Sequence, residues 1–526
     1  MTTRPATRGV DPRLLSALLS IAWIAVVFSP IILLGVEAIK ATLAAPSILM
    51  LALPTARRLG LLVNSLSLST LVSLSSVVVG ALAGSVLWRW DTGVLSRLRW
   101  LILALVPVPP YIHALSWMTT LNWLNSVLTG LGVTLPTTGW APTFFVEFMT
   151  YLPLGVGLAL IGYTGIDASL VEVARLHRPD SDAFLRVVLP LITPAMVAAG
   201  GLIFTFTLAD YSVPALFSVN VYSLEIFSDF SATNQASRAL VLSVPILLAS
   251  LMVLWFSQKS LKSTVQINAS SKPSPKLNYP LWIRVPQCIA AILTGSQVLV
   301  LLLSLIITTG GVSNIGYAVS MATSDIWFTL FQASATAVLC VPLALIAVDR
   351  LKNGSGLWWI IVLAPLGMPS PLIGISIIKL TAYTDLLYGT WATPVLGTLI
   401  RFTPVASIVA LAQLKRIDPL LFDAADLYKR SFTDAWTRVR LPLQASGLAA
   451  AMALVFAFTL GELGATLLTV PPGASTVTIR IFNYLHYGSS DIVAGLCLVM
   501  VAVMIIAGLA GVAFINLRAD SGRGPE

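Results

Sequence analysis

Long apolar runs alternate with short polar segments along the whole chain. Each run holds about 20 residues or more, which is enough for a helix to cross the hydrocarbon core of a bilayer. Twelve such helices are predicted, near residues 14–36, 61–88, 100–121, 143–165, 195–218, 239–257, 287–309, 328–349, 357–380, 392–413, 445–469 and 492–516. The pattern therefore predicts an all-α membrane protein with about twelve transmembrane helices.

A polar segment near the middle, QKSLKSTVQINASSKPSPKLNYP (258–280), separates two groups of six helices. Its lysine, serine, proline and asparagine residues are typical of a linker. The sequence predicts a first transmembrane half over residues 1–258, a cytoplasmic linker over 259–286, and a second transmembrane half over 287–526.

Composition supports the membrane assignment. The 526 residues are 57% hydrophobic and 10% charged, whereas soluble domains carry about 25% charged residues. The N-terminal run, MTTRPATRGVDPRLLSALLSIAWIAVVF, is longer than the apolar part of a signal peptide and has no small-residue cleavage pattern. It is expected to form the first transmembrane helix.

Positive charge is unevenly distributed over this topology. With the N-terminus in the cytoplasm, 24 of the 31 lysine and arginine residues fall on the cytoplasmic side, in line with the positive-inside rule. Both termini are therefore expected to be cytoplasmic, and the net charge of +9 requires no nucleic-acid partner. Seven basic residues remain for outer loops or helix interiors: Lys40, Arg57, Arg58, Arg238, Lys379, Arg401 and Arg480.

The two halves repeat one another at a spacing of 252 residues. Pro190 and Pro442 are 252 apart, and FTFTLADYSVPAL (204–216) aligns with FAFTLGELGATLL (456–468), which pairs Asp210 with Glu462. An even number of helices separates the copies, so the halves have the same orientation. Such pseudo-symmetric halves are related by an axis along the membrane normal.

A polar loop between the fourth and fifth helix of each half belongs to this repeat. The two copies are EVARLHRPDSDAFLRVVLPLITPA (172–195) and DAADLYKRSFTDAWTRVRLPLQASG (423–447). The leading acid favours a helix N-terminus, the small residues leave one face thin, and Leu-Pro breaks the register before the next span. Two equivalent loops predict two docking points for a two-fold symmetric cytoplasmic partner.

The loops resemble the EAA loop of ABC importer permeases, whose pattern runs E-A-A, three residues, G, then F, V and L-P. The second loop matches this spacing through Asp423, Ala424, Ala425, Trp436, Leu441 and Pro442. The first loop matches through Glu172, Ala174, Phe184, Leu189 and Pro190. It has Val173 at the second position and one residue fewer in the turn near His177, and both loops lack the usual glycine.

The resemblance extends over nearly the whole chain. The segment LGELGATLLTVPPGASTVTIRIFNYLHYGSSDIVAGL (460–496) is similar to the last hairpin of fused two-half permeases, a group that imports ferric iron, thiamine or phosphonates. The resemblance implies a permease subunit of the bacterial cytoplasmic (inner) membrane that forms the translocation pathway. The implied partners are two copies of an ABC ATPase subunit, docked on coupling helices in the two loops, and a periplasmic or extracellular substrate-binding protein.

The chain itself is not expected to be an enzyme. It contains no GxxxxGK[ST] phosphate loop and no Gly-Lys dipeptide, so ATP must bind to another chain. The histidines (113, 177 and 486) and the cysteines (288, 340 and 497) show no metal-binding spacing. No catalytic residue, metal site or cofactor is predicted.

Charged residues inside predicted spans are expensive and usually functional. Asp210 and Glu462 fall in the outer half of their helices, where they either line the gate and attract a cation or fix the gate by hydrogen bonds between helices. Arg401 either contacts an anion or is held by a structural pair. These three residues are the candidate pathway residues, whereas the lone imidazole of His113 is expected to be a packing residue.

Prolines interrupt two matching helices. They occur in LVPVPPYIHAL (105–115) and in APLGMPSPLIG (364–374). Each predicts either an interrupted helix beside the pathway, where a cavity accepts the broken backbone, or a simple packing kink.

Two other classes of protein compete with the permease. A twelve-helix secondary transporter driven by an ion gradient fits the helix count and the linker, but it does not explain the repeated loop. A membrane enzyme lacks any HExxH or GxSxG motif to support it. The two carboxylates favour a cationic substrate such as ferric iron or thiamine, and a phosphonate stays open.

Overall fold

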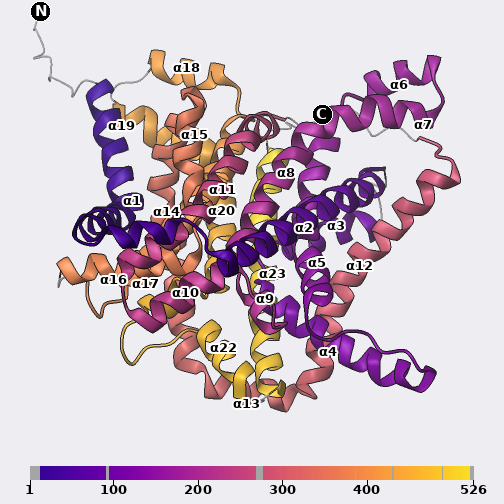
Figure 1. Ribbon diagram of the computed structural model, residues 1–526. Helices are drawn as coiled ribbons and strands as arrows, with labels where there is room; N and C mark the ends of the chain where they lie inside the picture. Colours follow the sequence, from indigo (N-terminus) through magenta and orange to yellow (C-terminus); the bar gives the residue numbers. More distant parts are fainter. Residues whose placement is uncertain are drawn as a thin grey trace, which may run out of the picture.

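The computed structural model describes residues 12–89, 94–267, 277–384, 387–428, 432–487 and 490–521. Every regular element in these ranges is helical (Figure 1). Ten of the described helices are long and apolar enough to cross a membrane, and an eleventh span results if a pair bent by 94° is counted as one. The protein is an all-α polytopic membrane protein, as predicted.

The first half of the chain forms fourteen elements. They are α1 (Pro12–Ala44), η1 (Pro46–Ala52), α2 (Ala56–Arg89), α3 (Val94–Ala104), α4 (Pro110–Leu128), η2 (Thr129–Leu131), α5 (Trp140–Thr164), α6 (Ala168–His177), α7 (Asp180–Ala183), the π-helix η3 (Phe184–Val188), α8 (Leu189–Ala209), α9 (Ser212–Leu216), α10 (Tyr222–Thr233) and α11 (Ala236–Val265).

The second half follows nearly the same order. Its elements are α12 (Leu281–Thr309), α13 (Val312–Met321), α14 (Thr323–Asn353), α15 (Gly356–Leu363), η4 (Ala364–Gly367), α16 (Ser370–Tyr383), α17 (Ala392–Leu414), α18 (Pro419–Tyr428), α19 (Phe432–Ala435), the π-helix η5 (Trp436–Arg440), α20 (Leu441–Leu460), α21 (Thr466–Thr469), α22 (Val477–Tyr487) and α23 (Ser490–Ser521).

The register of the repeat is visible in the helix bounds. The start of α7, the whole of η3 and the start of α8 recur 252 residues later in α19, η5 and α20, whereas α6 recurs 251 residues later in α18. The turn between the first two elements is therefore one residue shorter in the first copy, as the motif comparison indicated.

Two predicted spans are broken near their prolines. The span expected over 100–121 is divided between α3 and α4, and the span over 357–380 is divided between α15 and α16. Proline lacks the backbone N–H that would continue the helix, and the residue before a proline is disfavoured in the helical region. Of the two alternatives for these prolines, the interrupted helix is confirmed.

The linker is shorter than predicted. Helix α11 continues to Val265 and α12 begins at Leu281, so helix occupies both ends of the predicted 259–286 segment. Leu261 and Val265 are buried, which explains why the helix continues past the last long apolar run.

The first helix of each half packs on the other half. Helix α1 contacts α16, α14 and α17, and α12 contacts α2 and α4. Polar contacts accompany the exchange: Arg350 donates to Ser20 Oγ (2.6 Å), and Gln287 donates to Ser85 Oγ (2.8 Å). Because each of these pairs joins the two halves, the halves are interlocked around a shared centre.

Candidate functional site

A cavity of about 120 Å³ lies between the two halves. Its walls come from α5 and α17, from the two proline-broken segments, and from the chain that follows α8 and α20. The charged residues of its lining are Asp210, Arg401 and Glu462. The three candidate pathway residues, although far apart in sequence, therefore meet at one site.

Asp210 and Glu462 each lie where a long helix ends. The helices end at Ala209 and Leu460, so the predictions of continuous spans over 195–218 and 445–469 were wrong. Sequence periodicity missed these ends because the apolar pattern continues through the short helices α9 and α21. The carboxylates are placed at backbone breaks rather than within a regular helix.

Both carboxylates bind the short helix that follows. Asp210 accepts hydrogen bonds from Ser212 Oγ (2.8 Å) and from the Val213 N–H (3.1 Å). Glu462, 6% exposed, accepts from the N–H groups of Ala465 (3.0 Å) and Thr466 (2.9 Å) and from Thr466 Oγ1 (2.6 Å). Such bonds satisfy the free N–H groups at a helix start. The geometry favours a structural role in which the carboxylates hold the breaks in shape.

Two glycines let the broken segments approach each other. A Cβ atom at Gly461 would lie 2.6 Å from Pro109 Cγ, and one at Gly464 would collide with the Ser370 side chain. Any side chain at these positions would force the segments apart. The close contact of Gly461 and Gly464 with both proline breaks therefore defines one end of the cavity.

Arg401 projects from the middle of α17 with its guanidinium unpaired. No described residue forms an ion pair with it, and its Nη1 atom is buried without a hydrogen-bond partner. The ring centroid of Phe402, the next residue in the chain, lies 5.9 Å from the Arg401 Cζ. The expected alternative, a structural ion pair, is not found among the described residues.

Hydroxyl groups surround the same cavity. Tyr111, Tyr151 and Tyr211 line it; the Tyr211 hydroxyl is buried without a hydrogen-bond partner among the described residues, whereas the Tyr111 hydroxyl interacts with Thr478. Tyr151 and Tyr211 also interact electrostatically with Asp210 and Arg401. Among the described residues, the site thus combines a guanidinium without an ion-pair partner and the buried Tyr211 hydroxyl.

Glu147 is a buried acid that the sequence analysis missed. It lies on α5, is fully buried and interacts with Asp210. Among the described residues, neither carboxylate oxygen of Glu147 has a hydrogen-bond donor. The carboxyl groups of Glu147 and Asp210 can bond to each other only by sharing a proton. The signal was present in the sequence, because Glu147 is a lone charge in an apolar run like Asp210.

A second, apolar cavity of about 300 Å³ adjoins the first. Six side chains line both cavities, and they come in pairs from equivalent elements of the two halves: Val106 and Leu366, Leu154 and Val405, Phe206 and Phe458. We call these six residues the apolar ring. Gln413 and Arg416, near the end of α17 that leads to α18, line the second cavity. The ring therefore separates the polar cavity from a space on the side of the repeated loops.

The repeated loops lie at one end of the molecule, opposite α13 and α22 (Figure 1). Their first helices begin earlier than predicted, because Asp167 and Asp418 accept hydrogen bonds from Ser169 N (3.0 Å) and Leu420 N (2.9 Å). Glu172 and Asp423 are therefore exposed mid-helix residues and do not start their helices. The loop residues that the structure describes line neither cavity.

The remaining motif residues of the loops differ in burial. Phe184 is buried and Trp436 is half-buried, each as the first residue of its π-helix. Ala424 is exposed, and Ala174 and Ala425 are partly exposed. Leu189-Pro190 and Leu441-Pro442 begin α8 and α20.

The end of the linker packs on the first loop. Tyr279 is 3% exposed and meets the Phe184 ring edge-on at a centroid distance of 5.0 Å, and Asp180 accepts a hydrogen bond from the Asn278 N–H (2.5 Å). Burial raises the pKa of the Tyr279 hydroxyl, so this side chain stays neutral. The first loop thus has an intrachain support from the linker.

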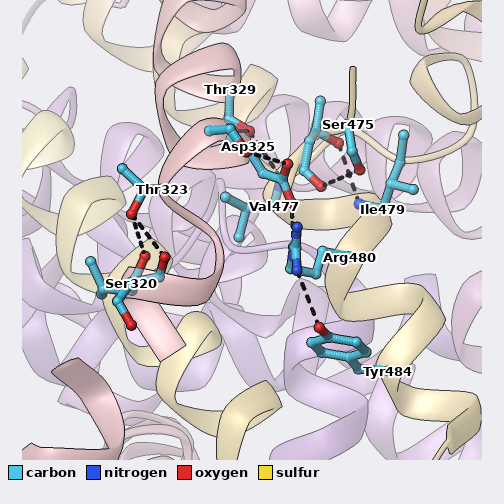
Figure 2. A network of polar contacts seen from close by, with 12 residues as sticks. Ser320, Thr323, Asp325, Thr329, Ser475, Val477, Ile479, Arg480 and Tyr484 are labelled. Carbon is cyan, nitrogen blue, oxygen red and sulfur yellow. Dashed lines mark hydrogen bonds and ion pairs between the residues drawn. The ribbon is translucent and has the colours of Figure 1, made fainter. Parts of the chain in front are cut away.

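A polar network holds α22 to the start of α14 (Figure 2). Arg480 forms an ion pair with Asp325 and donates to Tyr484 Oη (3.1 Å), and the Val477 N–H donates to Thr329 Oγ1 (3.0 Å). The hydrogen bond to Asp325 raises the pKa of Arg480, which therefore stays charged.

The first half has a corresponding ion pair with the charges exchanged. Arg57 and Arg58, at the start of α2, lie 2.5 and 3.7 Å from the carboxylate of Glu225 on α10. Since α2 corresponds to α14 and α10 to α22, both halves tie the same two elements together. The contact is repeated although the residue types are not.

His113 lies between the halves and does not line the polar cavity. It is fully buried, and its Nδ1 is 2.6 Å from Gln297 Nε2 on α12. Gln297 also accepts a hydrogen bond from Trp117 Nε1 (2.9 Å). His113 is placed as a packing residue.

No protein-family model matches the chain. Over 181 residues, 34% of this chain, it is 28% identical to the putative 2-aminoethylphosphonate transport system permease protein PhnV of Salmonella typhimurium and covers 67% of that protein. Over 443 residues, 81% of this chain, it is 21% identical to the Fe(3+)-transport system permease protein FbpB 2 of Haemophilus influenzae and covers 84% of that protein. Its relatives are thus transport permeases of the ABC type, and its sequence and helical fold are consistent with an ABC importer permease.

Proposed function

We propose that the chain is a fused permease subunit of an ATP-driven importer and forms the translocation pathway of that system. The observation that carries this proposal is the arrangement between the halves: a polar cavity, an apolar ring and a second cavity follow one another. A pathway closed by paired side chains from two related halves can open on one side by a relative movement of the halves. The bacterial inner membrane is the proposed location.

Two identical or related ATPase subunits dock on the repeated loops. Each loop presents an exposed helix with an acid, Glu172 or Asp423, and partly exposed alanines beside it. Small side chains allow another protein to approach the helix closely, and a pair of equivalent sites suits a two-fold symmetric ATPase dimer. A substrate-binding protein delivers the substrate at the opposite end.

The substrate is a small ion or solute. The named relatives carry 2-aminoethylphosphonate and ferric iron, and thiamine belongs to the same group by resemblance. All three fit the same transport scheme, because the binding protein provides much of the selectivity in such systems.

The experiment that tests this function is purification of the tagged chain from its native membranes in mild detergent, followed by mass spectrometry and an ATPase assay. We expect about two copies of an ATP-binding subunit per permease. A stable, isolated permease without ATPase activity would contradict the proposal and favour an ion-driven carrier.

Charge reversal in the loops tests the coupling role. Glu172→Arg combined with Asp423→Arg should abolish co-purification of the ATPase while the permease stays in the membrane, because two exposed contact charges are reversed. The matched control is Asp349→Arg, which reverses an exposed acid at the end of α14 outside the loops. Normal ATPase recovery with the double variant would remove these residues from the interface.

A further inference from the structure

The polar cavity contains a basic side chain that the fold leaves uncommitted. Of the seven basic residues predicted outside the cytoplasmic face, Arg57, Arg58, Arg238, Lys379 and Arg480 are ion-paired. Lys40 is exposed at the end of α1. Arg401 is partly buried, lines the cavity and pairs with no described residue. A partly buried guanidinium loses hydration without gaining a partner, so a bound anion would stabilise it.

The neighbouring donors suit an oxyanion. Tyr211 adds a buried hydroxyl without a described partner, and both Tyr211 and Tyr151 interact electrostatically with Arg401. Hydroxyl groups and a guanidinium together offer several hydrogen-bond donors to one group of oxygen atoms, and the guanidinium can bind such a group in a bidentate way. A bare metal cation would be repelled by Arg401 and would leave these donors unused.

The acidic side of the cavity suits a positive group on the same solute. Asp210 and Glu462 line the cavity together with a single arginine, and the buried Glu147 interacts with Asp210. A solute that carried only negative charge would face more carboxylates than basic groups. Electrostatic complementarity therefore calls for both signs on the substrate.

The equivalent helices α5 and α17 of the two halves carry charged residues of opposite sign. Helix α5 contains one acid, Glu147, and no basic residue, whereas its counterpart α17 contains one base, Arg401, and no acid. Tyr151 interacts electrostatically with both Glu147 and Arg401. Of the two charged residues only Arg401 lines the cavity, and the acidic lining comes from Asp210 and Glu462.

Resting on the proposed function, we propose that this cavity binds a small zwitterion, with its oxyanion on Arg401 and the Tyr211 hydroxyl, and its cationic group at Asp210. The cavity volume of about 120 Å³ is several times the roughly 30 Å³ that one water occupies in the liquid. It suits a solute of a few heavy atoms and is smaller than pockets for drug-sized ligands.

Calorimetric titration of the purified permease in lipid nanodiscs tests this assignment. The first probe, 2-aminoethylphosphonate, carries both charges. Ethylphosphonate carries the oxyanion alone, and ethylamine carries the cation alone. We expect 2-aminoethylphosphonate to bind most tightly. Arg401→Met should weaken it about tenfold to a hundredfold, the range of a lost charge-assisted hydrogen bond.

Three further variants separate binding from folding. Tyr211→Phe removes only a hydroxyl and should weaken binding about two- to tenfold. Arg401→Lys keeps the charge, loses the bidentate geometry and should fall between wild type and Arg401→Met. Lys262→Met removes a positive charge from α11 outside both cavities and should bind like wild type.

The outcomes distinguish this inference from the proposed function. Equal binding of 2-aminoethylphosphonate by wild type and Arg401→Met would overturn the assignment of Arg401. Ethylamine binding as tightly as 2-aminoethylphosphonate, or no binding of any probe while the ATPase subunit co-purifies, would overturn the zwitterion and leave the importer intact. Absence of the ATPase subunit from the wild-type preparation would contradict the importer itself.

Discussion

At the residue scale, the carboxylates at the helix breaks act first on the backbone. Glu462 is 6% exposed and accepts three hydrogen bonds from Ala465 and Thr466. Without that acceptor, the buried N–H groups of Ala465 and Thr466 at the start of α21 would lose these hydrogen bonds. The side chain therefore positions the segment that lines the cavity before it acts on any solute.

Glu462→Ala should lower the free energy of unfolding by about 1–3 kcal/mol, the cost of leaving buried donors unsatisfied. Thermal unfolding in detergent measures the effect. Glu172→Ala, at an exposed position on α6, is the control and should change stability by less than about 0.5 kcal/mol. Equal melting temperatures for the two variants would show that Glu462 has no structural role.

Sequence reasoning found most of the charged residues of the site but not their partners. Asp210, Arg401 and Glu462 were identified because a charge in an apolar run is costly. Glu147 satisfies the same criterion and was overlooked. That Arg401 has no ion-pair partner among the described residues could not be predicted, since it depends on where distant segments meet.

At the element scale, the halves keep their contacts while changing the residues that make them. The Asp325–Arg480 pair on α14 and α22 corresponds to Glu225 with Arg57 and Arg58 on α10 and α2. The first of these pairs is more protected, with side-chain exposures of 6% for Asp325 and 24% for Arg480, against 68% for Arg57 and 14% for Glu225. Exposure determines how much an ion pair stabilises, because water screens the exposed charges.

Double-mutant cycles should separate the two ion pairs. Alanine replacement of Asp325 and Arg480, singly and together, should give a coupling energy of about 1–3 kcal/mol, within the range for residues in one polar network. The same cycle on Arg57 and Glu225 should give about 1 kcal/mol or less. Thermal unfolding of the six single and double variants provides both values. Equal coupling energies would mean that burial does not distinguish the pairs.

The helix breaks show which features of the fold local sequence patterns can predict. The breaks at 105–109 and 364–369 contain prolines, and the sequence predicts them as one of two alternatives. The ends at Ala209 and Leu460 have no proline beside them, and the apolar pattern continues past both. They result from the carboxylates of Asp210 and Glu462 binding the chain that follows, which hydropathy does not register.

At the scale of the whole molecule, the central site depends on how the halves interlock. The repeat in the sequence predicts two related halves, but it does not reveal that α1 and α12 each pack on the opposite half. That exchange depends on tertiary contacts such as Gln297 of α12 with His113 and Trp117 of α4. The polar cavity and the apolar ring belong to neither half alone.

The apolar ring should control access to the polar cavity from the side of the loops. In a background without the native cysteines, Ser370→Cys provides a thiol in the polar cavity and Gln413→Cys one in the apolar cavity. In inside-out vesicles, a membrane-impermeant thiol reagent should modify Gln413→Cys quickly and Ser370→Cys slowly. Only the Ser370→Cys thiol lies behind the apolar ring, as seen from the side of the loops.

Removing the largest ring residues should abolish that difference. Phe206→Ala with Phe458→Ala opens the ring from both halves and should accelerate modification of Ser370→Cys at least severalfold, because water and reagent then pass between the cavities. The rate at Gln413→Cys should stay the same, which excludes a general loosening of the fold. An unchanged rate at Ser370→Cys would place the barrier elsewhere, and the two cavities would then have to be separated by a closure outside the six ring residues.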